Sequence, residues 1–116
     1  MTTEKITLKQ DFGPTIQFRG TLLADTDFET KKGGVKTGDM VLEVWETEGG
    51  AYIAYSELKY SNGAKNRRAT VIEQPYREDG RDTEYMQRAV LDAFDWNSHA
   101  RSMMRDAGWS LTWKVA

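Results

Sequence analysis

TEYMQRAVLDAFDWNSHARSMMRDA, residues 83–107, is the stretch that decides the fold, because no other long segment has a clear helical period. Its apolar side chains recur at the i, i+3, i+4 spacing that places one stripe along a helix. This stripe comprises Met86, Ala89, Val90, Ala93, Phe94, Trp96 or Asn97, Ala100, Met103, Met104 and Ala107. Asp82 or Thr83 can cap the start, and Gly108 can end the helix in the left-handed conformation. The pattern predicts one long helix packed against a sheet.

The residues before this helix alternate between apolar and polar side chains, which is typical of β-strands. Strands are expected at residues 5–9, 15–24, 40–47, 51–60 and 65–74, and a closing strand at residues 109–115. We therefore expect a single α+β domain over residues 1–116. It would consist of an antiparallel meander sheet of about five to six strands, one long C-terminal helix packed on it, and a final strand.

Two glycine-containing pairs, Gly49–Gly50 and Asn62–Gly63, predict tight hairpins between the last three strands of the meander. If both loops have two residues, Trp45 lies opposite Ala54, Tyr55 opposite Thr70, and Glu57 opposite Arg68. The face toward the helix then carries Met40, Leu42, Val44, Ile53, Tyr55, Thr70 and Ile72. The second face carries Val41, Glu43, Trp45, Tyr52, Ser56, Leu58, Arg67 and Val71. This face is too apolar to be fully solvated, so the N-terminal strands, another copy or a partner should cover it.

Residues 25–38 are polar and rich in glycine, and they are the longest candidate for a mobile, functional loop. A flexible hairpin tip is the favoured interpretation of this segment. Asp25, Asp27 and Glu29 alternate there, so an extended backbone would place three carboxylates on one side, where they could hold a divalent cation. Their spacing lacks the glycine and the terminal glutamate of a calcium-binding loop. Solvated acidic side chains are the favoured interpretation, and no metal site is expected.

The composition argues against several classes of protein. The chain has 16 basic and 18 acidic side chains and a net charge of −2, which is unlike a dedicated DNA-binding protein. It has no cysteine, and no apolar run approaches the length of a membrane span or follows the pattern of a secretory signal. We expect a cytoplasmic protein that does not interact with membranes.

Catalytic groups are not evident in the sequence. His99 is the single histidine and follows Ser98, but adjacent helical residues point about 100° apart, so they cannot act as base and nucleophile together. The segment GGVKTG, residues 33–38, has Val35 where a phosphate-binding loop requires glycine before the lysine. We therefore expect neither an enzyme nor a bound cofactor.

One basic cluster surrounds the predicted turn at Asn62 and consists of Lys59, Lys65, Arg67 and Arg68. A basic hairpin tip of this kind can reach the phosphates of a nucleic acid. Because the chain is acidic overall, a solvated hairpin end is the favoured interpretation, and nucleic-acid binding is the alternative.

Two segments, IQFRGTLLAD (residues 16–25) and VLEVWETEGGAYIAY (residues 41–55), resemble the small bacterial proteins of the EXLDI family. In that family an apolar strand that ends in a Leu-Leu or similar pair precedes a hairpin whose second strand begins with Gly, any residue and Tyr. The Leu-Asp-Ile motif of the family is absent from this chain. The family has no established activity, so the resemblance implies no function.

The second face contains the candidate partner-binding residues Trp45, Glu43, Tyr52 and Leu58, because an acidic and aromatic surface suits a basic site on another protein. We expect a small non-enzymatic protein-binding module, such as a phage or mobile-element inhibitor of a larger host protein. A homodimer formed through the same face is the other expected partner. The alternatives are a nucleic-acid-binding accessory protein that uses the basic cluster and a small-molecule-binding domain with a pocket between helix and sheet.

Overall fold

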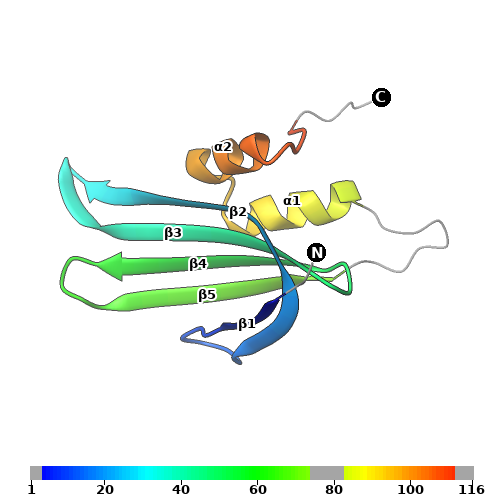
Figure 1. The fold of residues 1–116 in the computed structure, drawn as a ribbon. Coiled ribbons are helices and arrows are strands. Elements are labelled where there is room, and N and C mark those ends of the chain that lie inside the picture. Colours follow the sequence, from blue (N-terminus) through cyan, green and yellow to red (C-terminus); the bar gives the residue numbers. More distant parts are fainter. Residues whose placement is uncertain (1–3, 74–82, 112–116) are drawn as a thin grey trace.

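The computed structural model describes residues 4–73 and 83–111, which form one sheet and two helices (Figure 1). The strands are β1 (Glu4–Leu8), β2 (Ile16–Lys32), β3 (Val35–Thr47), β4 (Tyr52–Tyr60) and β5 (Lys65–Ile72), and the helices are α1 (Thr83–Ala93) and α2 (Ser98–Asp106). All neighbouring strands are antiparallel, in the order β1-β2-β3-β4-β5. The predicted α+β class and the meander order are confirmed.

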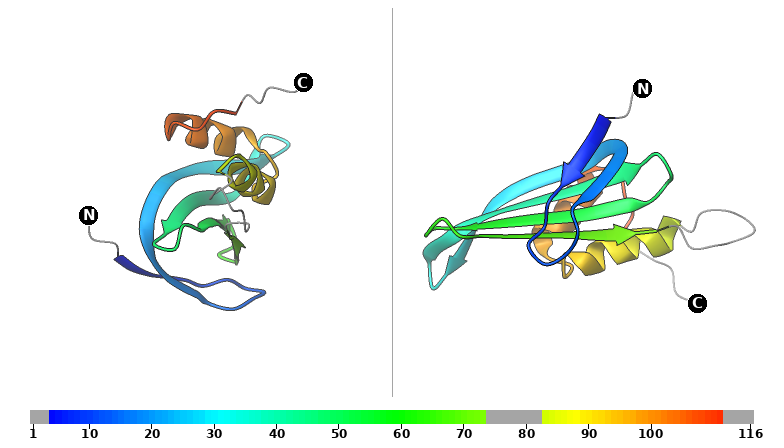
Figure 2. Two further views of the ribbon diagram at one scale, coloured as in Figure 1. Left: turned by 90° about the vertical axis from the view of Figure 1, so that its right-hand side faces the viewer. Right: turned by 90° about the horizontal axis from the view of Figure 1, so that it is seen from below.

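Both helices pack on the same face of the sheet, with α1 over β4 and β5 and α2 over β2 (Figures 1 and 2). The predicted apolar stripe of the helical segment supplies half of the buried core under the helices, and its Met86, Val90, Ala100 and Met104 are fully buried. Leu91 is also fully buried, although the predicted stripe does not include it. The sheet contributes Leu42, Val44, Tyr52, Ala54 and Ile72. No helix in the described ranges is long and apolar enough to span a membrane.

The helical segment is interrupted, so the prediction of one long helix is wrong. Asp95 and Trp96 have positive φ angles of 54° and 53°, and the Trp96 N–H donates to the Leu91 carbonyl at 2.9 Å, which ends α1. The Asn97 side chain then accepts a hydrogen bond from the Ala100 N–H at 2.8 Å and starts α2. Asn97 is therefore an N-cap inside an otherwise continuous helical pattern.

Gly108 ends α2 as predicted, with a φ of +96° that favours glycine. The N–H of Trp109 donates to the Met104 carbonyl at 2.9 Å, as expected when a left-handed residue terminates a helix. Residues 109–111 are not in a strand, which contradicts the start of the predicted closing strand. The remainder of that predicted strand lies outside the described residues, as does Asp82, one of the two predicted caps.

The two central hairpins have three-residue loops, so the predicted register is wrong. The Thr47 N–H donates to the Ala51 carbonyl at 2.9 Å across residues 48–50, and the Tyr60 N–H donates to the Ala64 carbonyl at 2.8 Å across residues 61–63. The last loop residue in each case is a glycine with positive φ, as in hairpins that close with a bulge. The observed pairs are Trp45–Ile53, Tyr55–Ala69 and Glu57–Arg67.

This register change exchanges the two faces predicted for β4, whereas the faces of β5 are as predicted. A shift of one residue moves every side chain of a strand to the other face, and the second shift restores the original assignment. Ile53 and Tyr55 therefore lie opposite the helices, whereas Tyr52 and Ala54 lie under them. Ser56 and Leu58 also lie on the helix side, because they pair with Leu42 and Met40.

Residues 25–38 belong to a hairpin, as the favoured interpretation of this segment expects, but most of them lie in strands, so the prediction of a loop over the whole range is wrong. Strand β2 continues to Lys32 and β3 begins at Val35, with Gly33 and Gly34 at positive φ in the turn. Thr30 and Thr37 hydrogen bond to each other across this hairpin at 2.9 Å. A bulge between Leu22 and Ala24 changes which side chains of β2 face the helices.

Candidate interaction surface on the second sheet face

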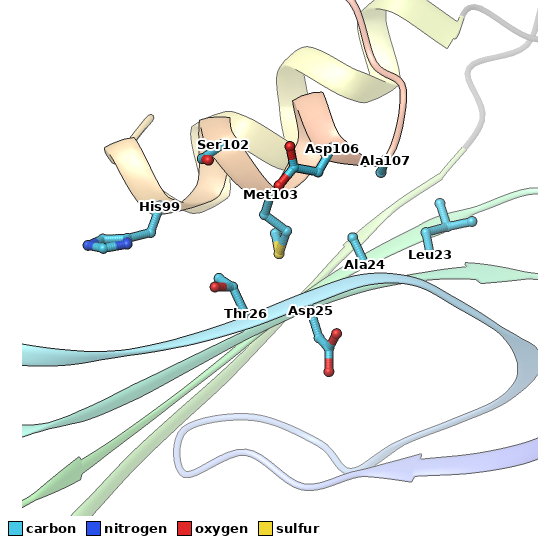
Figure 3. A pocket seen from close by; sticks show the side chains of 9 residues that line it. All are labelled: Leu23, Ala24, Asp25, Thr26, His99, Ser102, Met103, Asp106 and Ala107. Atoms are coloured by element: carbon cyan, nitrogen blue, oxygen red, sulfur yellow. The ribbon is translucent and has the colours of Figure 1, made fainter.

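The second face is the surface of the sheet opposite the helices. Register and alternation assign to it Val41, Glu43 and Trp45 of β3, Ile53, Tyr55 and Glu57 of β4, and Arg67, Ala69 and Val71 of β5. From β2 it receives Phe18 and Leu22 before the bulge and Asp25, Asp27 and Glu29 after it. Figure 3 shows this alternation directly, because Thr26 points toward α2 and Asp25 points away from it.

The N-terminal strands cover one half of the second face, which we call the apolar half. Figure 2 shows β2 curving so that β1 and the loop after it pass across the sheet. Leu8, Ile53 and Tyr55 are buried there, and Ile6, Ile16, Phe18, Trp45 and Ala69 pack against them. Of the covers expected from the sequence, the N-terminal strands are therefore the one observed on this half.

The loop between β1 and β2 is attached to the edge of β5. Asp11 accepts hydrogen bonds from the Arg67 backbone N–H at 2.6 Å and from the Arg67 guanidinium at 3.0 Å. The Asp11 N–H donates to the Arg67 carbonyl at 3.1 Å, and the Gln10 side chain accepts from the Ala69 N–H at 3.2 Å. Two hydrogen bonds to the Asp11 carboxylate lower its pKa. The bond from the Arg67 backbone N–H has the larger effect, and the bond from the Arg67 guanidinium has the smaller one. These contacts also occupy backbone groups at the β5 edge.

Tyr55 is the buried titratable group of the apolar half. Its hydroxyl donates to a carboxylate oxygen of Glu57 at 3.3 Å. Burial, reinforced by the negative charge of Glu57, raises the pKa of Tyr55 to about 12. Tyr55 is therefore a neutral hydrogen-bond donor at physiological pH and belongs to the packing of this half.

The other half of the second face carries a high density of carboxylates, and we call it the acidic half. It consists of Asp25, Asp27, Glu29, Asp39 and Glu43. Two pairs of like charge face each other directly across β2 and β3, Asp25 opposite Glu43 and Glu29 opposite Asp39. Such opposed like charges destabilise a sheet.

Lys36 partly neutralises the acidic half near the hairpin turn. Its ammonium group lies 3.2 Å from Asp39 and 3.6 Å from Glu29. Both carboxylates raise the pKa of Lys36, and Asp39 has the larger effect. Asp25 and Asp27 are exposed and form no ion pair with any described residue. The described residues also contain no group of three or more His, Asp or Glu side chains that could hold a metal ion. The acidic half is thus an extended negative surface.

Trp45 joins the two halves. Its ring meets Phe18 edge-on, with 5.8 Å between ring centroids, and its indole N–H donates to Glu43 at 3.1 Å. The Trp45 side chain is half-buried and packs against the apolar half. Of the four candidate partner-binding residues, the structure brings together Trp45 and Glu43 on the second face.

Tyr52 and Leu58 lie on the opposite face of the sheet, which corrects their predicted placement. Tyr52 is 4% exposed and packs in the helix-side core, 5.4 Å from the ring of Trp109. Leu58 lines a hollow on the helix side together with Met40 and Phe94. Neither side chain can contribute to a contact made by the second face.

The basic cluster is also divided by the observed register. Lys59 and Lys65 face each other, and Arg67 shares their side, but Arg68 lies on the helix side opposite Ser56. Lys65 lies 3.7 Å from Glu57, and Arg67 is bound to Asp11. The predicted position of Arg68 opposite Glu57 is wrong, because Arg67 is the residue opposite Glu57.

His99 lies in an open groove of about 320 Å³ between α2 and β2 (Figure 3). Its ring stacks on Phe28, with 3.7 Å between centroids and 8° between planes. The other polar residues that line the groove are Asp25, Thr26, Ser102 and Asp106. The stacking accounts for the position of His99, and the groove is the nearest counterpart of the pocket expected between helix and sheet.

Sequence reasoning did not identify the acidic half as one surface. The signal was present in the alternation of Asp25, Asp27 and Glu29, which has the period of a strand. Their partners Asp39 and Glu43 could be assigned only once residues 25–38 were known to form a hairpin. Comparisons of the chain with protein-family models, curated proteins and solved structures give no match.

Proposed function

We propose that this chain is a small non-enzymatic binding module whose acidic half binds a basic surface of another protein. The observation that carries this proposal is the pairing of Asp25 with Glu43 across β2 and β3, because the other opposed pair, Glu29 and Asp39, already forms ion pairs with Lys36. Directly opposed carboxylates lower the stability of the free protein, and a cationic partner would remove their repulsion. Val41 and the exposed part of Trp45 supply adjoining apolar area.

A basic protein fits the acidic half better than a second copy of this chain. In a two-fold symmetric dimer formed through this half, carboxylates would face carboxylates. Lysine- and arginine-rich surfaces are common on proteins that bind nucleic acids, and such proteins are therefore suitable partners. Inhibition of a larger host protein, by covering its basic site, remains our specific proposal for the biological role.

The experiment compares the wild-type protein with a double variant, Asp25→Lys and Asp27→Lys, as tagged baits in a nuclease-treated lysate of the native host. Captured proteins are quantified by mass spectrometry after elution with increasing salt. We expect a basic partner that elutes at moderate salt from the wild-type bait and is lost from the double variant. The matched control is the double variant Glu84→Lys and Asp106→Lys, which changes the net charge equally, because both are exposed carboxylates on the helices.

If the acidic half is the binding surface, the control variant should still capture the basic partner. Retention by the double variant as well would exclude the acidic half as the binding surface. A partner that is lost from both variants would indicate a response to net charge and not to the second face.

A further inference from the structure

Phe12, in the loop between β1 and β2, is held away from the rest of the molecule. Its side chain is 95% exposed, although both neighbouring segments are fixed. Asp11 is bound to Arg67, and Gln10 is bound to the Ala69 N–H on one side and to the Pro14 carbonyl, at 3.0 Å, on the other. These hydrogen bonds fix the backbone on either side of Phe12, which reduces the backbone entropy lost when the ring binds a ligand.

A hollow of about 320 Å³ lies beside this ring at the edge of β5. It is lined by Gln10, Phe12, Asn66, Arg67, Arg68 and Ala69. Arg68 is exposed and forms no ion pair with any residue of the described ranges. The hollow thus combines an aromatic face, an available guanidinium and an amide, and its volume is at the lower end for small-ligand sites.

We propose that Phe12, Asn66 and Arg68 form a binding site for single-stranded nucleic acid. A base stacks on the ring of Phe12, and an adjacent phosphate pairs with the Arg68 guanidinium, the combination by which single strands are bound without sequence readout. The Asn66 amide can hydrogen bond to the base edge. In a duplex the faces of the bases are covered by their stacked neighbours, so Phe12 cannot stack on them and binding should be weaker.

This site is independent of the proposed protein-binding surface. The acidic half lies on β2 and β3, whereas the hollow lies beside the outer edge of β5. Substitutions at Asp25 therefore should not weaken nucleic-acid binding, and substitutions at Phe12 should not weaken capture of a basic protein. The two proposals can fail separately.

The test is fluorescence anisotropy with a labelled oligothymidylate of about 15 nucleotides at low salt. We expect Phe12→Ala to weaken binding by roughly 5- to 100-fold and Phe12→Trp to retain it, because both rings offer a stacking face. Arg68→Gln should weaken binding and reduce its salt dependence. Matched controls are Val35→Ala, another exposed apolar side chain, and Arg101→Gln, another exposed arginine.

Several results would overturn the proposal. They are absence of oligonucleotide binding at low salt, equal affinity of the wild type and Phe12→Ala, and equal affinity for a duplex of the same length. Loss of protein capture by Phe12→Ala, without any effect on the oligonucleotide, would instead identify Phe12 as a protein contact. Circular dichroism of each variant verifies that the fold is retained.

Discussion

Asp11 and Arg67 are joined by hydrogen bonds in both directions, although 56 residues separate them in the chain. The Asp11 carboxylate accepts from the backbone and the guanidinium of Arg67, and the Asp11 N–H donates to the Arg67 carbonyl. This contact fixes the loop after β1 against the edge of β5. It thereby holds β1 over the apolar half and holds Phe12 beside the hollow.

Replacing Asp11 by Asn should lower the thermal stability near neutral pH, because the ion pair with Arg67 is lost. The pKa of Asp11 is lowered below its ordinary value of 3.8, so its stabilising contribution is present above that pH and is lost as the pH falls through the lowered pKa. The difference in Tm between wild type and variant should therefore shrink as the pH falls below 3.8. Thermal unfolding monitored by circular dichroism measures this difference in Tm. A difference that does not depend on pH would contradict the assignment of the effect to the ion pair between Asp11 and Arg67.

Replacing Gly20 by Ala should destabilise the protein by about 1–3 kcal/mol, the usual effect of forcing extra atoms into a packed site. Gly20 is buried in β2, and an added methyl group would overlap the backbone carbonyl of Glu46 on β3. Gly49→Ala is the matched control, since the nearest atom to its added methyl group is Thr47 Oγ1 at 3.9 Å. Urea denaturation of both variants tests this prediction, which fails if the two behave alike.

Replacing Asp95 by Gly should stabilise the protein by roughly 0.5–1 kcal/mol, because a non-glycine residue is strained in the left-handed region. Asp95 has a φ of 54° at the end of α1. Asp95→Ala, which lacks both the conformational freedom of glycine and a polar side chain, should not be stabilising. Both are measured as changes in Tm. A stability loss in the glycine variant would show that the Asp95 side chain makes a favourable contribution.

Replacing Asp25 by Lys should stabilise the free protein by roughly 0.2–1 kcal/mol, because a repulsive pair with Glu43 becomes an attractive one. The same substitution is part of the variant expected to lose the basic partner, so stability and binding should change in opposite directions. Unfolding at low and high salt is the measurement, since screening should diminish the gain. A decrease in stability would refute the view that the acidic half is strained in the free protein.

Local pattern was sufficient for the order of the strands and for most of the helical core. Alternation of apolar side chains located part of each of the five strands but not the long hairpin of β2 and β3, and the period of the helical segment identified most of the helix side chains in the core, though not Leu91. Gly108 ends α2 as its conformational freedom suggests. These features depend on a few consecutive residues, which is why the sequence alone reveals them. The interruption at Asn97 is also local. The apolar period continues through this residue, however, so the period alone predicts a continuous helix and hides the N-cap.

The faces of the sheet were decided by tertiary structure. A loop that contains Gly49 and Gly50 is compatible with two or with three residues, and that single-residue difference exchanges the environments of Tyr52 and Ile53. The bend of β2 and the contact between Asp11 and Arg67 join residues far apart in the chain, so no local pattern encodes them. By itself the sequence determined strands, turns and the apolar side of the helices. Burial of β1 against the sheet decided which carboxylates and which aromatic ring remain available to a partner.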